Sequence, residues 1–532
     1  MRKNDREHRI RPGRVMLGAL SGALAGFAAL AVAELVAGVV RPQAGPVVAV
    51  GGAAIDRTPA AVKDWAIRHF GTDDKLVLQL GILAVLTIFA LLLGIAALRF
   101  RRTASAGVLL FGVVGAAAAT SRPDSTGVLD ALPSVAGAVT GAALLYALVG
   151  RLTPRGPVTP ARSAPFPDAG WDRRGFVIAA TAAAAASAGA GLLGRSLSGS
   201  RSRSAVASRE NVVLPAPASP AGPVPKGAGL RVPGVSAFTT PSSDFYRVDT
   251  ALVVPKVDAT SWRLRIHGDG VRRPRNLSFD DLLRRELIER DITLTCVSNE
   301  VGGPYVGNAR WIGVRLADLL AECGVEPPSK GGPADQLVAR SVDGMTIGSP
   351  VEDLMDGRDA LLAVGMNGRP LPFDHGFPVR MVVPGLYGFV SACKWVEDIE
   401  LTTFDSYDPY WVKRGWARRA PVKTASRIDT PKPFARPAAG TVMVAGVAWA
   451  QHRGIDRVEV RVDDGPWQDA RLATEDTRDT WRQWSFAWQA TKGGHTLTVR
   501  ATDRTGQVQT EKRTRTIPDG ASGRHSVVVT VE

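Results

Sequence analysis

The sequence contains few of the residues from which multi-ligand metal and redox sites are built. It has three cysteines and seven histidines among 532 residues. Three cysteines are too few for a disulfide framework, a cysteine-rich zinc site or a cysteine-ligated iron–sulfur cluster. No histidine lies in a run long enough to span a membrane, and no Cys-x-x-Cys-His motif occurs. The sequence therefore argues against haem held between membrane helices.

A concentrated basic face is missing as well. Lysine and arginine number 65 against 50 acidic residues, which gives a formal net charge of +15. These cations are scattered or flank apolar runs, and they do not alternate with aromatic residues as in a nucleic-acid-binding stripe. Charges that orient a membrane protein explain the excess better, so no nucleic-acid partner is expected. The length predicts two or three domains.

Five apolar stretches near the N-terminus are candidates for membrane spans, at residues 15–40, 76–98, 104–120, 132–150 and 175–194. They predict an all-α membrane domain of about five helices over residues 1–195, embedded in the lipid bilayer. Glu34 is the one charged residue inside these stretches. Because transport sites usually need intramembrane charges, a transporter is disfavoured, and the helices are expected to anchor the chain or to form a docking surface.

The positions of the basic residues predict the orientation of this domain. They group at the N-terminus, after the second stretch and before the fifth. The groups are Arg2, Lys3, Arg6, Arg9, Arg11 and Arg14; Arg99, Arg101 and Arg102; and Arg151, Arg155, Arg162, Arg173 and Arg174. A cytoplasmic N-terminus puts all three on one side, so five crossings place the later domains outside the cytoplasm. Arg195, Arg201, Arg203 and Arg209 do not fit this rule.

Arg173 and Arg174 precede the weakly apolar, alanine-rich fifth stretch, in the string Asp-Arg-Arg-Gly-Phe-Val at 172–177. This string resembles a twin-arginine export signal, although it is internal. Such a signal implies that the following domains fold, and receive any cofactor, before they cross the membrane. The alternative is that the two arginines are ordinary flanking charges.

Three further segments follow the membrane domain. Residues 196–235 are rich in Ser, Pro, Ala and Gly, which predicts a disordered or polyproline-type tether. Residues 236–425 mix short strands and helices, including a helix capped by Ser278, and predict an α+β domain. Residues 426–532 alternate with period two between turn signals, which predicts an immunoglobulin-like β-sandwich.

Cys296 ends a strand-like run in Thr293-Leu-Thr-Cys-Val-Ser-Asn299, ahead of the flexible Gly-Gly-Pro at 302–304. A thiolate at the end of a rigid strand, with a mobile polar loop behind it, suits a metal that prefers soft ligands. By itself, a lone cysteine is more often a small buried apolar residue. Cys323 and Cys393 are expected to be separate buried thiols, although a disulfide between them after export is the alternative.

The string Met-Asn-Gly-Arg-Pro-Leu-Pro-Phe-Asp-His-Gly-Phe-Pro-Val-Arg at 366–380, followed by Cys-Lys-Trp-Val at 393–396, resembles the molybdopterin-binding domain of the sulfite oxidase family. The resemblance covers about residues 238–404, and the predicted sandwich resembles the family's dimerisation domain. It implies an oxidoreductase with a small-molecule substrate and a molybdenum–molybdopterin cofactor in its mononucleotide-free form. It also implies a homodimer, while Arg- and Trp-rich strand faces could equally dock an external electron carrier or a quinone-linked partner.

The resemblance assigns Cys296 as the molybdenum ligand. It implies a set of residues that bind the pterin cofactor: Arg247, Asn299, His375, Arg380 and Lys394. The chemistry agrees, because an anionic phosphate held by such cations gains charge-assisted hydrogen bonds of about 1.5–3 kcal/mol each.

Three positions depart from the family. Glu300 stands where sulfite oxidases carry a substrate-binding arginine, Trp416 where they carry a tyrosine near the metal, and Asp249 where they carry a histidine. Glu300 and Trp416 are therefore predicted as catalytic residues beside Cys296. A carboxylate at the mouth would repel sulfite, so another substrate is expected. Reduction of an S- or N-oxide and an oxidation are both consistent with the residues.

Two alternatives stay open at this point. A set of arginines either lines the entrance or is solvated surface charge: Arg310, Arg414, Arg418 and Arg419. The whole chain could also be a non-catalytic, membrane-anchored binding module that retains the molybdenum-enzyme fold as a scaffold. Molybdenum analysis separates this binding module from the molybdenum-dependent enzyme.

Overall fold

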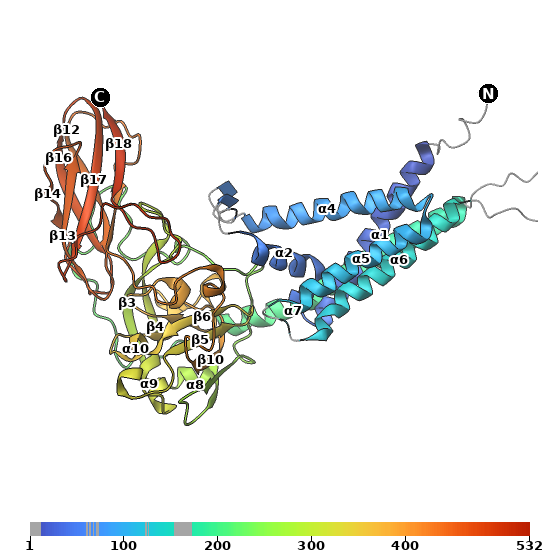
Figure 1. Ribbon diagram of the computed structural model, residues 1–532, viewed down its shortest axis with the longest axis horizontal. Coiled ribbons are helices and arrows are strands. Elements are labelled where there is room, and N and C mark those ends of the chain that lie inside the picture. Colours follow the sequence, from blue (N-terminus) through green and yellow to red (C-terminus); the bar gives the residue numbers. More distant parts are fainter. Residues whose placement is uncertain are drawn as a thin grey trace, which may run out of the picture. The chain divides into compact units, whose positions relative to one another are not determined.

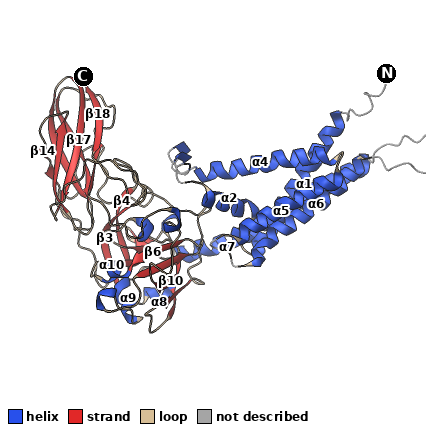
Figure 2. Cartoon of the chain, in the orientation of Figure 1, coloured by secondary structure: helices blue, strands red, loops and turns tan. Residues whose placement is uncertain are grey.

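The computed structural model describes residues 12–59, 62, 65–66, 69–70, 74–122, 125, 127–153 and 173–532. It divides into two compact units (Figure 1). The first comprises residues 1–204 and 250–253, and the second comprises residues 205–249 and 254–532. The first unit is helical, and the second contains all the strands of the described chain (Figure 2).

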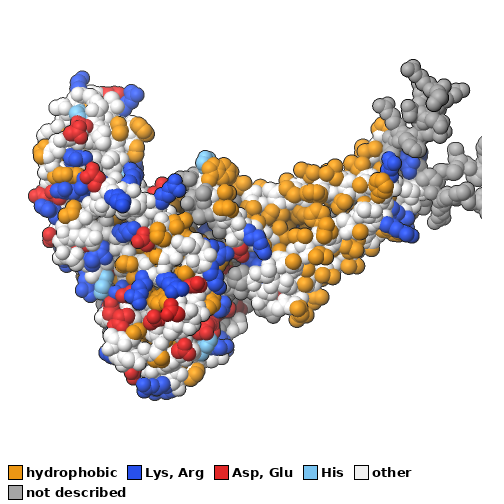
Figure 3. Space-filling view, in the orientation of Figure 1, with side chains coloured by type: hydrophobic (Ala, Val, Ile, Leu, Met, Phe, Trp, Pro, Cys, Tyr) orange, Lys and Arg blue, Asp and Glu red, His pale blue; other side chains and the backbone are white. Residues whose placement is uncertain are grey.

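Five helices of the described residues are long and apolar enough to cross a membrane. They are α1 (Pro12–Val39), α4 (Asp74–Ala97), α5 (Arg101–Thr120), α6 (Leu132–Leu152) and α7 (Arg173–Glu210). Hydrophobic side chains cover much of their visible outer surface (Figure 3). The five predicted spans are thus confirmed as helices. The charged N-terminal residues 2–11, Arg155, Arg162 and Asp172 lie outside the described residues, and the orientation stays a prediction.

Small residues bring these helices into close contact. A Cβ added to Gly22 of α1 would lie 1.9 Å from the Ala90 carbonyl oxygen of α4. A Cβ on Gly137 of α6 would lie 2.4 Å from the carbonyl oxygen of Ala29. Such close backbone approach is typical of helix packing in lipid. The short helix α2 (Pro46–Arg57), between the first two spans, was not predicted.

The structure contradicts the predicted tether over residues 196–235. Helix α7 continues to Glu210, since its Arg, Ala and Leu residues favour helix. The chain then runs along strand β3 (Leu287–Thr295), where the Ala218 amide donates to the Leu287 carbonyl at 2.8 Å and the Glu289 amide to that of Ser219 at 2.9 Å. The proline-rich stretch is therefore extended, but hydrogen bonds hold it against strand β3 and it belongs to the second unit.

The α+β domain has two sheets. The first has the strand order β2-β1-β10-β5-β6, and the second β3-β4-β7-β8 with β9 also paired to β7. The first contains β1 (Arg263–Gly268), β2 (Arg275–Ser278), β5 (Gln336–Ser341), β6 (Thr346–Pro350) and β10 (Val396–Thr402). The second contains β3, β4 (Val306–Arg315), β7 (Leu361–Met366), β8 (Arg369–Pro370) and β9 (Arg380–Val382).

Three short helices accompany these sheets: α8 (Phe279–Leu283), α9 (Leu316–Glu322) and α10 (Val351–Met355). Ser278 caps α8 as predicted, with a full capping box to Asp281. Val314 and Arg315 complete strand β4, and helix α9 begins directly after them at Leu316. All three cysteines are free and buried, so Cys323 and Cys393 are separate thiols. Burial raises the pKa of both.

The C-terminal part is a β-sandwich, as predicted. One sheet has the order β11-β12-β16-β15, and the other β14-β13-β17-β18, with all pairs antiparallel. The strands are β11 (Ala425–Thr430), β12 (Gly440–Trp449), β13 (Ile455–Val462), β14 (Gln468–Asp469), β15 (Arg471–Leu472), β16 (Arg482–Ala490), β17 (Gly493–Asp503) and β18 (His525–Val531). Alternate residues such as Val444, Val458 and Trp484 fill a separate core between the sheets.

Candidate functional site

Cys296 directly follows the last residue of β3 and begins a hydrogen-bonded turn. Its amide donates to the Tyr305 carbonyl at 2.9 Å, and its carbonyl accepts from the Asn299 amide at 3.0 Å. A second turn follows at once, in which the Gly303 amide donates to the Glu300 carbonyl at 2.8 Å. The residue as a whole is 7% exposed, so a fixed backbone holds a buried cysteine. We refer to residues 296–305 as the cysteine turn.

Asn299 supports the cysteine turn from inside. Its side-chain Oδ1 accepts from the Tyr305 amide at 2.8 Å. A Cβ added at Gly303 would lie 2.7 Å from that oxygen, so glycine is needed where the loop folds over the amide. The neighbouring Glu300 is exposed. The structure thus gives Asn299 a role in shaping the loop and leaves the Glu300 carboxylate at the surface.

Three basic side chains predicted to bind the cofactor converge around Gly376. His375 ends the 3-10 helix η5 (Phe373–His375), Arg380 begins β9, and Lys394 precedes β10. Gly376 has φ +108°, and a Cβ there would lie 3.0 Å from the Cβ of Arg380 and 3.1 Å from that of Lys394. A larger residue is therefore excluded by both backbone conformation and space. We call His375, Arg380 and Lys394 the basic cluster.

Arg380 is a buried cation that no described carboxylate contacts. Its Nη1 donates to the His375 carbonyl at 3.2 Å and its Nε to the Met381 carbonyl at 3.4 Å. The guanidinium carbon lies 5.0 Å from the centre of the Trp311 ring. Burial lowers the pKa of Arg380 to about 10. A buried cation with only weak acceptors is costly, and an anion beside it would remove that cost.

His375 is held neutral beside this guanidinium. Its Nε2 donates to the Ser242 carbonyl at 2.9 Å. Burial, followed by the charge of Arg380, lowers the pKa of His375 to about 4. With Nε2 protonated, the neutral ring keeps Nδ1 as a hydrogen-bond acceptor.

Asp249 lies between two of the cations predicted to bind the cofactor, Lys394 and Arg247. Lys394 Nζ donates to Asp249 Oδ2 at 2.8 Å and to the Asp374 carbonyl at 3.1 Å. Arg247 lies 3.7 Å from Asp249 and 3.7 Å from the Asp374 carboxylate. The Asp249 side chain is 2% exposed. The residue that replaces the family's histidine thus forms a buried ion pair with one predicted cofactor ligand and lies near another.

Aromatic side chains connect the cysteine turn to the basic cluster. Phe245 contacts Trp311 edge-on with the ring centres 5.7 Å apart, and Tyr246 and Tyr305 lie 6.3 Å apart. Tyr246 is partly buried and lies within electrostatic reach of both Cys296 and Arg380. Burial, with the Cys296 charge as the next cause, raises its pKa, so the phenol stays neutral. Sequence reasoning missed Tyr246, and its position next to Arg247 is the signal that could have found it.

A polar cleft opens beside the cysteine turn. Thr295 and Asn299, on either side of Cys296, line it together with Glu300. Residues of the β-sandwich complete it, including Gln509 and residues 521–523. Within this cleft, in the described chain, the lining contains one carboxylate and no Lys, Arg or His. Its lining offers hydroxyl, amide and carboxylate groups to a polar molecule.

Two aromatic residues, Tyr387 and Trp416, differ in their position relative to the cleft. Tyr387 lines the cleft, and burial raises its pKa to about 12. Trp416 is buried against Phe389, with ring centres 5.3 Å apart, and against Trp411 at 5.8 Å. Trp416 does not line the cleft, whereas Tyr387, which sequence reasoning did not single out, does.

The arginines considered for the entrance have other partners and do not line the cleft. Arg310 pairs with Asp291 at 2.6 Å, and Arg418 with Asp408 at 3.0 Å. Arg414 donates to the Tyr410 carbonyl at 2.8 Å, and Arg419 lies 5.5 Å from the centre of the Phe404 ring.

The sandwich also touches the cysteine turn directly. A Cβ added at Gly302 would lie 2.2 Å from Cδ2 of His525, the first residue of β18. His525 Nδ1 accepts from the Ile428 amide at 3.0 Å. Burial lowers the pKa of His525 to about 4, so this imidazole packs against the turn in its neutral form.

Comparison with known proteins identifies relatives of the second unit. A family model described as "Oxidoreductase molybdopterin binding domain" matches residues 251–411. The chain is 31% identical over 337 residues to sulfite oxidase of Gallus gallus, covering 52% of this chain and 72% of the relative. It is 33% identical over 162 residues to "Uncharacterized oxidoreductase YuiH" of Bacillus subtilis, covering 30% of this chain and 75% of that relative.

The match to the mammalian relatives covers a smaller share of their length. Identity to mitochondrial sulfite oxidase of Rattus norvegicus is 30% over 291 residues, or 47% of this chain. The match spans 53% of that relative, which is about half of its length.

Proposed function

Because the chain belongs to the sulfite oxidase family of molybdopterin-binding oxidoreductases, we propose that it is a membrane-anchored enzyme that moves an oxygen atom or electrons to or from a small substrate. The observation that carries this proposal is Arg380, a buried guanidinium without a carboxylate partner among the described residues. Such a residue is expected where the protein awaits an anion.

The residues fit a molybdenum–pterin group. The Cys296 sulfur is a soft ligand on a fixed turn, and the basic cluster supplies two cations and a neutral imidazole for a phosphate. Arg247 lies next to this cluster through Asp249 and Asp374. The basic cluster provides enough cations for a single phosphate, which supports the mononucleotide-free form of the cofactor. When bound, the group supplies two-electron redox chemistry linked to gain or loss of an oxygen atom.

The protein's own residues orient the reactants. Asn299 fixes the cysteine turn, Trp311 lies against Arg380, and the neutral Tyr246 phenol lies within electrostatic reach of both Cys296 and Arg380. Tyr387 and Glu300 line the cleft where a substrate approaches the turn. Tyr387, with a pKa of about 12, stays protonated at neutral pH and can donate a hydrogen bond to a substrate oxygen. Trp416 supports this edge through Phe389.

The cleft favours a substrate other than sulfite. A dianion needs cations in contact with it, whereas this lining offers hydroxyls, amides and the Glu300 carboxylate. A neutral S- or N-oxide, or a neutral molecule to be oxidised, matches these groups better. The proposal therefore leaves the direction of electron flow to be measured.

The five apolar helices support a multi-pass membrane location. The positive-inside pattern places the second unit outside the cytoplasm, and Arg173 and Arg174 serve in twin-arginine export of the folded, cofactor-loaded unit. A quinone-linked or external electron carrier is then the electron partner. A homodimer through the sandwich is the expected assembly.

Metal analysis of the full-length protein tests the proposal directly. Expression with ample molybdate should yield about one molybdenum per chain together with a released pterin. Protein without molybdenum under these conditions would leave the non-catalytic binding module as the better reading. The buried Arg380 argues against that module, because a scaffold gains nothing from an unpaired internal cation.

A further inference from the structure

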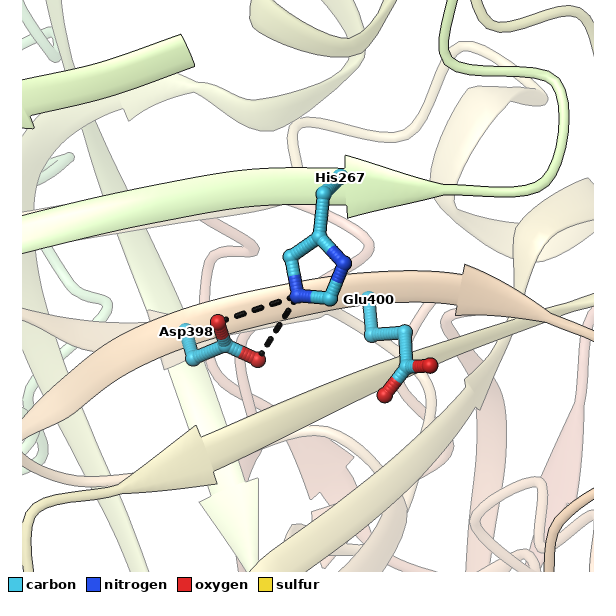
Figure 4. A group of neighbouring side chains, drawn as sticks. All are labelled: His267, Asp398 and Glu400. Carbon is cyan, nitrogen blue, oxygen red and sulfur yellow. Dashed lines mark hydrogen bonds and ion pairs between the residues drawn. The ribbon is translucent and has the colours of Figure 1, made fainter. Parts of the chain in front are cut away.

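His267, Asp398 and Glu400 lie together on one face of the first sheet, on the adjacent strands β1 and β10 (Figure 4). Strands β1 and β10 are parallel neighbours, and their register places His267 opposite Glu400. Asp398 precedes Glu400 by two residues, and side chains two apart on a strand share a face. The register thus puts one imidazole between two carboxylates.

The ligand atoms of the three side chains all lie within 4.8 Å of one another. His267 Nε2 is 3.0 Å from Asp398 Oδ2 and 3.2 Å from Oδ1. The His267 and Asp398 side chains are partly buried, at 22% and 20% exposure, and Glu400 is likewise intermediate. Their chain positions are far apart, since His267 and Asp398 are separated by 131 residues.

We propose that His267, Asp398 and Glu400 form a second metal site, for a divalent transition ion of the Zn²⁺ type. One nitrogen and two carboxylate oxygens are ligands that such ions accept, and three protein ligands leave room for water. Coordination through Nε2 requires the neutral ring with its proton on Nδ1. The ion then replaces the hydrogen bond between Nε2 and Asp398.

Other histidine–carboxylate pairs in the described chain lack a third ligand. His495 Nδ1 lies 2.8 Å from Asp463, and His452 Nδ1 lies 3.3 Å from Asp479. Neither pair belongs to a group of three potential ligands among the described residues, whereas His267 does. These pairs are natural controls for the proposed site.

Two cations compete with the ion. Arg265 Nε lies 3.7 Å from Asp398 Oδ2, but its side chain is 63% exposed and the pair is weak. Arg340 of β5 is the cross-strand partner of Asp398 by register. Both lower the affinity without blocking the ligand atoms. Removing Arg265 should therefore tighten metal binding.

The site would fasten the two ends of the α+β domain together. The β1–β10 pair is the parallel pair of its sheet, and β1 lies near the start of this domain while β10 lies near its end. An ion bound to both strands in the folded state alone adds stability by mass action. The bound ion would therefore stabilise the fold and take no part in the molybdenum chemistry.

Full-length protein in detergent, treated with a chelator, is titrated with ZnCl₂ by calorimetry, and bound zinc and molybdenum are measured together. We expect about one Zn²⁺ per chain and a higher unfolding temperature. His267→Ala, Asp398→Asn and Glu400→Gln should each weaken binding by about tenfold or more. His495→Ala should bind as the unchanged protein does, and Arg265→Gln should bind more tightly.

Zinc binding that is equal in Glu400→Gln and the unchanged protein would overturn the proposal, as would no binding at micromolar zinc. Glu400→Gln is nearly isosteric, so a folding failure is not expected to obscure the result. The gain of affinity in Arg265→Gln provides a readout that misfolding cannot imitate. Molybdenum content reports separately on the proposed function.

Discussion

Asp249 and Lys394 form a buried ion pair, with Oδ2 and Nζ 2.8 Å apart, at the edge of the basic cluster. The carboxylate stands where the sulfite oxidase family carries a histidine, and the lysine is a predicted cofactor ligand. Part of the cluster's positive charge is therefore neutralised from within the protein. An anionic group bound at the basic cluster would therefore experience a weaker positive field than Lys394 alone would give.

Replacing Asp249 by Asn should destabilise the protein. Lys394 would keep its charge in a buried place after losing its 2.8 Å pair with the Asp249 carboxylate, at a cost of about 3 kcal/mol. Thermal unfolding of the full-length protein measures this effect. Asp405→Asn is the control, because Asp405 is 98% exposed and its 3.4 Å pair with Arg418 should contribute little. The double variant Asp249→Asn/Lys394→Met should recover stability, and no recovery would contradict the ion-pair explanation.

Cys296→Ser should abolish turnover and change the molybdenum absorption spectrum, because the soft thiolate is replaced by a hard hydroxyl. The circular dichroism spectrum should stay unchanged. Cys323→Ala serves as the control, since Cys323 is a buried thiol in the hydrophobic core outside the cysteine turn. Unchanged turnover in Cys296→Ser would rule out this residue as the metal ligand.

Arg380→Gln should separate anion binding from structural support. Cofactor content should fall by about tenfold or more, because a charge-assisted hydrogen bond of about 1.5–3 kcal/mol is lost. The cofactor-free protein should be as stable as before, or more so, since a buried unpaired charge has gone. Arg310→Gln should show the reverse pattern, because Arg310 pairs with the buried Asp291. Destabilised, fully loaded Arg380→Gln would refute the anion-site interpretation.

Acid should weaken the contact between the sandwich and the cysteine turn. The pKa of His525 is lowered to about 4, so between pH 6.5 and 4 the unfolded chain binds a proton that the folded chain does not. Stability is then lost as the pH falls through this window, by about 1–3 kcal/mol from this residue. His525→Gln should flatten the curve of unfolding temperature between pH 7 and 5.

His495 gives a control of opposite sign for that experiment. The hydrogen bond that His495 donates to Asp463 raises the pKa of His495, so its contribution is present at low pH and is lost as the pH rises past the folded pKa. His495→Gln should therefore lower stability more at pH 5.5 than at pH 8. Identical pH profiles in the two variants would show that neither histidine controls the acid response.

Glu300→Arg should improve the use of sulfite. A cation in the lining of the cleft replaces a carboxylate, so KM for sulfite should fall and become sensitive to salt. Glu300→Gln removes the negative charge without adding a positive one and should lie in between. Steady-state assays with sulfite and with a neutral S-oxide measure both effects. Equal sulfite kinetics in all three proteins would show that Glu300 does not select the substrate.

Sequence alone predicted the features that local pattern controls. The five spans follow from long apolar runs, the strands of the sandwich from alternation, and the Ser278 cap from its side-chain chemistry. The family resemblance of the string at 366–380 assigned His375 and Arg380 to one site, and in the structure Arg380 donates to the His375 carbonyl at 3.2 Å. The location of Cys296 at a strand end was likewise visible.

Features that depend on tertiary register could not be predicted in this way. Lys394 and Asp249 are separated by 145 residues, and their pairing became visible only with the fold. Residues 211–235 have a linker composition, yet backbone hydrogen bonds, which composition does not encode, attach them beside β3. Tyr246 was overlooked because burial between Cys296 and Arg380 is a property of three separate segments.

The contact between Gly302 and His525 means that the sandwich is more than an appendage to the chemistry. Its loops form one wall of the cleft, so insertions or exchanges there would alter which molecules reach the cysteine turn without changing any predicted cofactor ligand. Enzymes of this architecture can therefore diversify by remodelling the neighbouring domain. By the same reasoning, a truncated protein that ends before β11 would expose the cysteine turn to solvent.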